Sequence, residues 1–125
     1  MGPRVFVVED DQQIIELYRV ILKMYGYEFA GFALDGKEAV QVFEAMNPRP
    51  DIIIMDQRLP LMNGVEATKE IMRMDPGAKV LFVSADNRSR ESALSSGAMG
   101  FITKPFQMKD FMTHLDDLSG KSAPR

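Results

Sequence analysis

Carboxylates gather at two points along the sequence, each directly after a short apolar run. Glu9, Asp10 and Asp11 follow the apolar residues 5–8, and Asp56 follows the apolar residues 52–55. Acids that meet in a fold repel one another strongly unless a cation lies among them. Because the chain has no cysteine and a single histidine, these residues offer oxygen ligands for Mg²⁺ or Mn²⁺. We therefore expect a divalent-cation site in which a carboxylate can act as a nucleophile toward phosphorus.

Two further apolar runs end at polar residues that should lie at the same edge of the fold. Ser84 closes the run VLFVS, and Lys104 follows GFIT. A lysine there can neutralise phosphoryl oxygens. Structural roles compete with these: Ser84 can satisfy local backbone groups, and Lys104 can be a solvated lysine. Asp10 and Asp11 can cap the helix that follows them, and Asp56 can be an ordinary loop acid.

The elements that must position these residues are predicted by short apolar runs that alternate with amphipathic stretches about five times. This alternation predicts an α/β fold with a doubly wound, five-stranded parallel sheet in the flavodoxin-like strand order 2-1-3-4-5. Strands are expected at residues 5–8, 28–32, 51–55, 79–84 and 100–103. Helices are expected at residues 14–25, 39–46 after an Asp35 cap, 65–74, 90–96 and 108–118. Since ligands bind outside the carboxyl ends of parallel strands, the residues above should converge at one edge of the sheet.

The composition predicts one domain and excludes several classes of partner. The domain is expected at residues 1–118, with the small, polar residues 119–125 as a flexible tail or the stump of a linker. A net charge of -3 lacks the basic excess that direct nucleic-acid binding needs. The apolar runs are far shorter than the roughly 20 residues of a membrane span. Without cysteine or a signal-peptide pattern, we expect a cytoplasmic protein with no membrane partner.

Four motifs in order resemble those of response regulator receiver domains of two-component signal transduction: VFVVEDD, IIIMDQRLPLMNG, VLFVSA and GFITKPF. The resemblance covers nearly the whole chain, and each motif lies at a predicted strand end. It implies that Asp56 is phosphorylated in a magnesium-dependent reaction, with a histidine kinase or phosphotransfer protein as the donor. It also implies a switch that is not a turnover enzyme. The switch would control a downstream protein or output domain, as a monomer or a phosphorylation-dependent dimer.

The same resemblance assigns roles to the residues around Asp56. The metal ligands would be Glu9, Asp10, Asp56 and the backbone carbonyl of Arg58. Four residues would bind the phosphoryl group or take part in the switch: Ser84, Ala85, Phe101 and Lys104. The switch would carry the effect of phosphorylation to the face built by the fourth helix, the fifth strand and the last helix. Pro105 matches a proline that is often preceded by a cis bond. Glu9 stands where the family often has Asp, and Phe101 lacks the hydroxyl of a tyrosine.

Two charged residues are predicted to control how long the phosphoryl group survives. Arg58 lies two residues after Asp56, and Asp86 lies two residues after Ser84, so both should project over the mouth of the site. A bidentate pair between them would lie across the path of the hydrolytic water. Ala85 is small enough to leave the donor access to the site. The alternative is that each charge is independently solvated.

Two other functions use similar residues. Haloacid-dehalogenase-like phosphatases also form an aspartyl phosphate with Mg²⁺, but their nucleophile follows the first strand in a DxD pattern. Here EDD is consecutive, and the isolated acid Asp56 follows the third predicted strand. Steady turnover of small phosphoesters would indicate that class of enzyme. A flavodoxin-like phosphate binder should have a first loop rich in Ser, Thr and Gly, whereas EDDQQ would repel a phosphate.

Overall fold

A parallel sheet of five strands forms the centre of the computed structural model, which describes residues 2–120. The strands are β1 Arg4–Val8, β2 Glu28–Ala33, β3 Ile52–Asp56, β4 Val80–Ser84 and β5 Gly100–Thr103. Their order is β2-β1-β3-β4-β5, and every neighbouring pair is parallel. The predicted fold class and strand order are confirmed. The bounds differ slightly, since β2 continues to Ala33 and β3 includes Asp56 itself.

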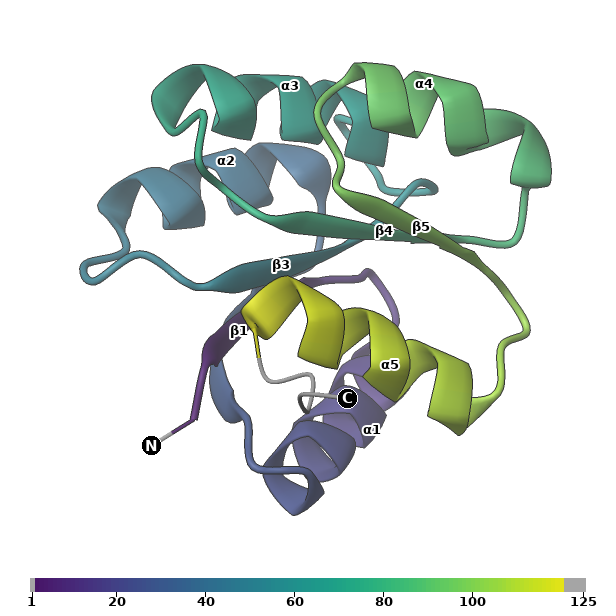
Figure 1. The fold of residues 1–125 in the computed structure, drawn as a ribbon. Coiled ribbons are helices and arrows are strands. Elements are labelled where there is room, and N and C mark those ends of the chain that lie inside the picture. Colours follow the sequence, from purple (N-terminus) through teal and green to yellow (C-terminus); the bar gives the residue numbers. More distant parts are fainter. Residues whose placement is uncertain (1, 121–125) are drawn as a thin grey trace.

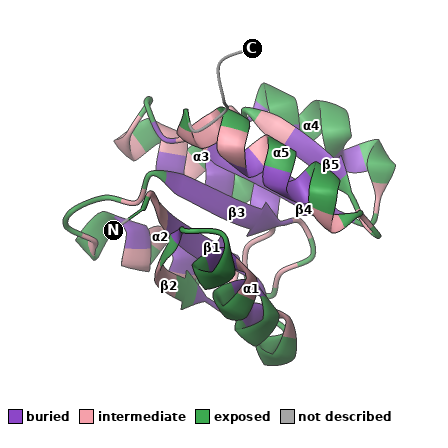
Figure 2. Ribbon diagram, turned by 60° about the horizontal axis from the view of Figure 1, so that its bottom comes forward, coloured by how far each residue is buried: buried purple, intermediate pink, exposed green. Residues whose placement is uncertain are grey.

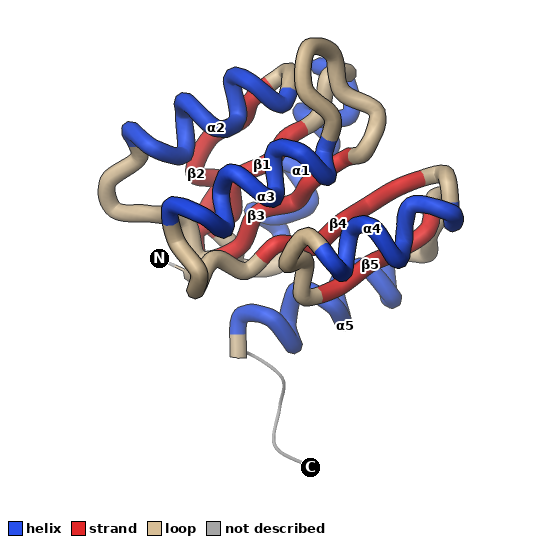
Figure 3. The backbone as a smooth tube through the Cα atoms, turned by 90° about the horizontal axis from the view of Figure 1, so that it is seen from above, coloured by secondary structure: helices blue, strands red, loops and turns tan. Residues whose placement is uncertain are grey.

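The helices cover both faces of this sheet. They are α1 Gln12–Met24, α2 Gly36–Ala45, α3 Gly64–Met74, α4 Arg90–Ser95 and α5 Met108–Ser119. Helices α1 and α5 lie on one face, and α2, α3 and α4 lie on the other (Figure 1). Viewed from above, α2, α3 and α4 lie over the sheet and run roughly along its strands (Figure 3). None of the helices in the described part of the chain is long and apolar enough to cross a membrane.

Each face of the sheet has its own hydrophobic core, because alternate residues of a strand point to opposite sides. Phe6 and Phe82 pack with α2 and α3, whereas Ile54 packs with α1 and α5 residues such as Phe111. Every residue of β3 and β4 is buried, which Figure 2 shows for β3. This explains why these strands appear in the sequence as continuous apolar runs rather than as alternating patterns.

The starts of α1, α2 and α3 are fixed by side-chain caps. Asp11 accepts a hydrogen bond from the backbone N–H of Gln13 at 2.9 Å, so the capping role belongs to Asp11 and not to Asp10. Asp35 caps α2 as predicted, by accepting from the N–H of Glu38 at 2.7 Å. These caps fix where the chain turns from β1 into α1 and from β2 into α2.

All five helices differ from their predicted bounds, by one to three residues at an end: α1, α2 and α3 begin earlier than predicted, and α1 and α2 also end one residue earlier. Helix α4 ends at Ser95 and follows a short 3₁₀ turn, Asn87–Ser89, that the sequence did not predict. Helix α5 continues to Ser119 and ends at Gly120, whose φ of 77° is accessible to glycine without steric cost. Ser119, predicted as the first residue of a tail at 119–125, belongs to α5, and residues 121–125 lie outside the described chain.

The strand register brings the predicted site residues to one edge. Val8 pairs with Met55, so the residues that follow β1 lie beside Asp56 at the end of β3. Asp56 in turn pairs with Val83, and Ser84 pairs with Thr103, the residue before Lys104. The carboxyl ends of β1, β3, β4 and β5 thus meet where parallel sheets bind ligands.

Candidate functional site

Three carboxylates form a cluster at this edge of the sheet. Glu9, Asp10 and Asp56 each offer one oxygen, and these oxygens lie within 4.8 Å of one another. Glu9 and Asp56 are buried, whereas Asp10 is exposed. An all-oxygen set that is open to water on one side fits Mg²⁺, which keeps several of its own waters. The convergence predicted for these three acids is confirmed.

Glu9 is held within the sheet edge rather than in solvent. Its side chain is 4% exposed, and one carboxylate oxygen accepts from the backbone N–H of Asp11 at 3.0 Å. The other oxygen lies 3.6 Å from the Lys104 ammonium. Burial raises the pKa of Glu9 above its usual value, and the charge of Asp56 adds to this shift. The longer Glu side chain thus still reaches the cluster.

Lys104 neutralises part of the acidic charge. Its ammonium donates to an Asp56 oxygen at 3.4 Å, and the Lys104 side chain is only 27% exposed. The same Asp56 oxygen accepts from the backbone N–H of Gln57 at 3.0 Å. Burial nevertheless raises the pKa of Asp56, and the Lys104 charge only partly opposes that rise. Lys104 is therefore part of the site, and the solvated-lysine interpretation is wrong.

Hydrogen bonds and a close backbone contact hold the loop after β3 beside the site. Gln57 accepts a hydrogen bond from the backbone N–H of Val65 through its side-chain oxygen at 3.0 Å, and its carbonyl accepts from the N–H of Gly64 at 3.1 Å. A Cβ on Gly64 would collide with the backbone carbonyl oxygen of Asp56, so only glycine fits there. Leu61 lies in this loop with a φ of 66° and an exposed fraction of 81%. The loop that would supply the Arg58 carbonyl is thus built from close backbone contacts.

Ser84 lies at the end of β4 and is 2% exposed. Its hydroxyl oxygen accepts from the backbone N–H of Asp86 at 3.0 Å, and the Ser89 hydroxyl lies 3.2 Å away. The structural alternative, in which Ser84 satisfies local backbone, is therefore correct for this conformation. Its role toward a phosphoryl group stays a prediction.

Phe101 and Pro105 flank Lys104 in sequence. The Phe101 ring is 5% exposed and stacks on Phe82 with ring centroids 5.9 Å apart. The ring therefore lies inside the fold in this conformation. The Arg90 guanidinium lies 5.6 Å from its centroid. The predicted cis bond before Pro105 is present.

The predicted ion pair between Arg58 and Asp86 is wrong. The Asp86 carboxylate instead binds Arg88, whose Nε donates to it at 3.0 Å. Asp86 also accepts from the Arg88 backbone N–H at 2.9 Å, because it caps the 3₁₀ turn. These contacts lower the pKa of Asp86, with Arg58 contributing only a minor long-range attraction. A partner two residues away is cheaper to order than one on another loop.

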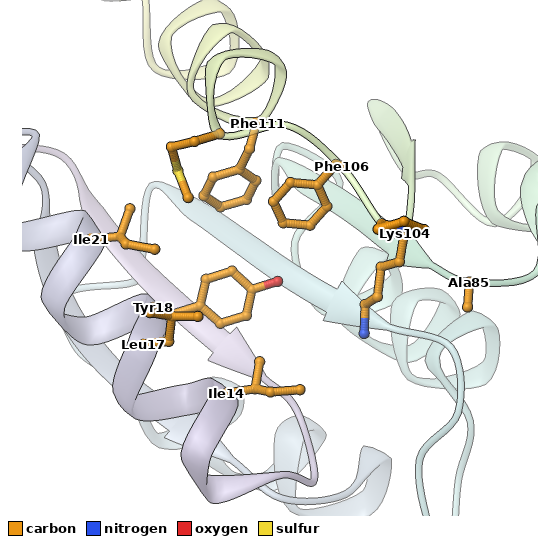
Figure 4. A pocket seen from close by; sticks show the side chains of 10 residues that line it. Ile14, Leu17, Tyr18, Ile21, Ala85, Lys104, Phe106 and Phe111 are labelled. Carbon is orange, nitrogen blue, oxygen red and sulfur yellow. The ribbon is translucent and has the colours of Figure 1, made fainter.

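An apolar groove of about 460 Å³ opens beside Lys104, between α1 and the start of α5. It is lined by Ile14, Leu17, Tyr18, Ile21, Ala85, Lys104, Pro105, Phe106, Met108 and Phe111. In Figure 4 the Tyr18 hydroxyl and the Lys104 ammonium point toward the same end of this groove. Burial raises the pKa of Tyr18, and the Glu9 and Asp56 charges raise it further.

Sequence reasoning missed three residues around the site. Tyr18 appeared only as part of the apolar stripe of the first helix, since its spacing is that of a core residue. Gln57 and Ser89 sit in loops, where partners depend on backbone geometry that a pattern does not encode. The only signal that could have marked Gln57 was its place directly after Asp56.

Comparison with known proteins agrees with this geometry. The family profile "Response regulator receiver domain" matches residues 5–116. The chain is 40% identical over 121 residues to the chemotaxis protein CheY of Thermotoga maritima, which covers 95% of this chain and 99% of that protein. The matched share of both chains indicates that the likeness extends over the whole domain.

Solved structures give the same result. One match is the receiver domain of the sensor histidine kinase PA1611 from Pseudomonas aeruginosa, with a TM-score of 0.83 and 29% identity. The match covers 96% of this chain and 99% of that one, and that structure has a magnesium ion in its active site cleft. A chain of the CheX–CheY complex from Borrelia burgdorferi, which contains beryllofluoride and magnesium, matches with a TM-score of 0.86 and 27% identity, covering 92% and 87%. With its acidic cluster at the ends of β1 and β3, this chain belongs to the response regulator receiver domain family.

Proposed function

We propose that the chain is a cytoplasmic phosphoacceptor switch in which Asp56 takes a phosphoryl group from a histidine kinase or phosphotransfer protein. The observation that carries this proposal is the position of Asp56. It is buried, paired with Lys104 at 3.4 Å, and grouped with Glu9 and Asp10 within 4.8 Å. A buried acid needs such partners, and a phosphoryl group needs cations around it.

The transfer step follows from these groups. An Asp56 oxygen attacks the phosphorus of a phosphohistidine, so that an O–P bond forms as the N–P bond breaks. The imidazole of the donor leaves with the electron pair and takes up a proton. Lys104 then stays beside the new phosphoryl oxygens, and Asp10 remains open to water as a metal ligand. Bound Mg²⁺ would neutralise phosphoryl oxygens that the carboxylates alone would repel.

The donor is expected to dock at the groove beside Lys104. Leu17 is 58% exposed on α1, and the apolar lining of the groove extends from α1 to Phe106 and Met108. An amphipathic helix that packs there can bring a histidine to the neighbouring Asp56. Output to a downstream protein or an attached domain is assigned to the face formed by α4, β5 and α5, since Ser84 and Phe101 connect the site with it.

This proposal is tested with acetyl phosphate and Mg²⁺. Intact mass spectrometry should show one added phosphoryl group on the wild type, none on Asp56→Asn, and none when EDTA removes the metal. Asp51→Asn is a matched control, because it removes an exposed acid from the same segment and should leave the labelling unchanged. Undiminished labelling of Asp56→Asn, or catalytic turnover of a small phosphoester, would overturn the proposal.

A further inference from the structure

Ser84 and Ser89 form a buried hydroxyl pair that the metal site does not use. Their oxygens lie 3.2 Å apart, and the two residues are 2% and 9% exposed. Ser89 occupies the N-cap position of α4, yet its side chain makes no capping hydrogen bond. Its hydroxyl is instead the donor toward both the Asp86 carbonyl at 2.6 Å and the Ser84 hydroxyl oxygen at 3.2 Å, so its single proton is shared between them. The Ser89 side chain therefore contacts the end of β4 and the residues that follow it, and it does not cap its own helix.

These contacts occupy the Ser84 hydroxyl on every side. A hydroxyl has one proton and two acceptor lone pairs. Ser84 accepts from the Asp86 N–H at 3.0 Å and from the shared Ser89 proton at 3.2 Å, and its own proton faces the Asp86 carbonyl at 3.3 Å. To donate to a phosphoryl group on Asp56, the Ser84 side chain must turn away from Ser89. The Ser89 contact therefore opposes that movement.

We propose that Ser89 is a positioning residue that holds Ser84 in the unphosphorylated conformation and so sets how readily the site closes on a phosphoryl group. This inference rests on the proposed function and adds a residue that controls its switch. Ser89 is also the last residue of the 3₁₀ turn before α4, so its release would free the start of that helix. Movement of Ser84 is thus coupled to α4 through one hydroxyl contact.

Ser89→Ala tests this with little structural cost. The Asp86 carbonyl keeps its hydrogen bond from the Ser89 backbone N–H at 3.1 Å, so no buried polar group is left unpaired. Calorimetric titration with beryllofluoride and Mg²⁺ should show binding about 2- to 10-fold tighter than in the wild type, the range expected for one neutral hydrogen bond. Ser89→Cys, which keeps the shape but donates only weakly, should shift the affinity in the same direction.

Ser96→Ala is a closely matched control. Ser96 is 7% exposed and donates to the Ala93 carbonyl at 2.6 Å, three residues earlier, as Ser89 does to Asp86. Within the described part of the chain its hydroxyl has no hydrogen bond with Ser84, so its removal should leave beryllofluoride affinity unchanged. In a Ser84→Ala background, Ser89→Ala should likewise have no effect, because the group that it positions is absent.

The outcomes separate this inference from the proposed function. If the wild type does not bind beryllofluoride with Mg²⁺, the proposed function fails. If the wild type binds but Ser89→Ala and Ser89→Cys bind equally well or more weakly, only the positioning role of Ser89 fails. Equal tightening in the Ser84→Ala background would also overturn it, since the effect would then not pass through Ser84.

Discussion

Replacing Asp56 with Asn should make the metal-free protein more stable at neutral pH, although it removes the residue on which function depends. The side chain is buried, and burial raises its pKa, which means that the folded protein resists its charge. Asn keeps the shape and removes the charge. Lys104 retains a second acidic neighbour, Glu9, at 3.6 Å, so the substitution does not leave the ammonium unpaired.

The magnitude follows from the distances around Asp56. At an effective dielectric of about 20, the Lys104 ammonium at 3.4 Å attracts Asp56 by about 5 kcal/mol. The Glu9 and Asp10 oxygens, within 4.8 Å, repel it by about 3.5 kcal/mol each. Repulsion exceeds attraction by about 2 kcal/mol before desolvation is added, and screening of the exposed Asp10 reduces this. We expect Asp56→Asn to gain about 1–2 kcal/mol of unfolding free energy, which is about 0.5–1 M in urea midpoint.

The effect should depend on pH in a defined direction. Well below a pH of about 3.9, the ordinary pKa of an unfolded Asp, both the unfolded carboxyl group and the folded one with its raised pKa are protonated. As the pH rises, the unfolded chain ionises first, so the wild type loses stability relative to Asp56→Asn until the folded pKa is passed. The advantage of the variant should therefore be small at acid pH, grow as the pH rises, and level off above the folded pKa of Asp56.

Urea unfolding in EDTA measures this difference, and Glu44→Gln on the exposed surface of α2 controls for the change in net charge. Adding Mg²⁺ should reverse the ranking, since a ligand at 100 times its Kd stabilises a folded protein by about 2.7 kcal/mol and the variant lacks one metal ligand. An Asp56→Asn protein that is less stable than the wild type in EDTA at pH 7 would refute the reasoning, because the Lys104 pair would then outweigh the repulsion.

Three further substitutions test other parts of the site. Leu61→Asn should raise the unfolding free energy by about 1 kcal/mol, measured in urea, because Asn tolerates the left-handed backbone at φ 66° better than Leu; no gain would mean that this conformation costs nothing. Lys104→Met removes the cation beside two buried carboxylates, so it should destabilise the metal-free protein by about 1–3 kcal/mol at pH 7. It should also weaken beryllofluoride binding, and an unchanged affinity would exclude Lys104 from phosphoryl binding. Asp86 is paired with Arg88 rather than with Arg58, so the effects of Arg58→Ala and Asp86→Ala on the aspartyl-phosphate half-life should multiply in the double variant. A double variant whose half-life is no shorter than that of either single variant would show that Arg58 and Asp86 do act as a pair.

The sequence was sufficient for the fold and for the charged part of the site. Buried parallel strands give continuous apolar runs, so the runs ending at Val8, Met55 and Ser84 could be identified as strands. Their carboxyl ends could then be placed at one edge of the sheet. The acids that follow such runs must meet, because parallel strands all end on the same side. The strand ends therefore predicted that acids of the run 9–11 meet Asp56, and the resemblance selected Glu9 and Asp10 from that run.

The sequence was not sufficient where short-range geometry decides between partners. Asp86 could have bound Arg58 or Arg88, and only the 3₁₀ turn at Asn87–Ser89 places the second one in reach. The Ser84–Ser89 contact depends on the same turn. The inward Phe101 ring depends on packing against Phe82 from a neighbouring strand, and no periodicity specifies which way a strand-end ring rotates.

The central claim, that Asp56 is the residue that accepts the phosphoryl group, is tested most directly by chemical trapping. The protein is treated with a phosphodonor and Mg²⁺, the acyl phosphate is reduced with borohydride, and the peptides are sequenced by mass spectrometry. The account predicts that Asp56 is converted to homoserine and that the neighbouring acids Glu9, Asp10 and Asp11 are unchanged. Conversion at any of those three acids, or no conversion at Asp56, would contradict it.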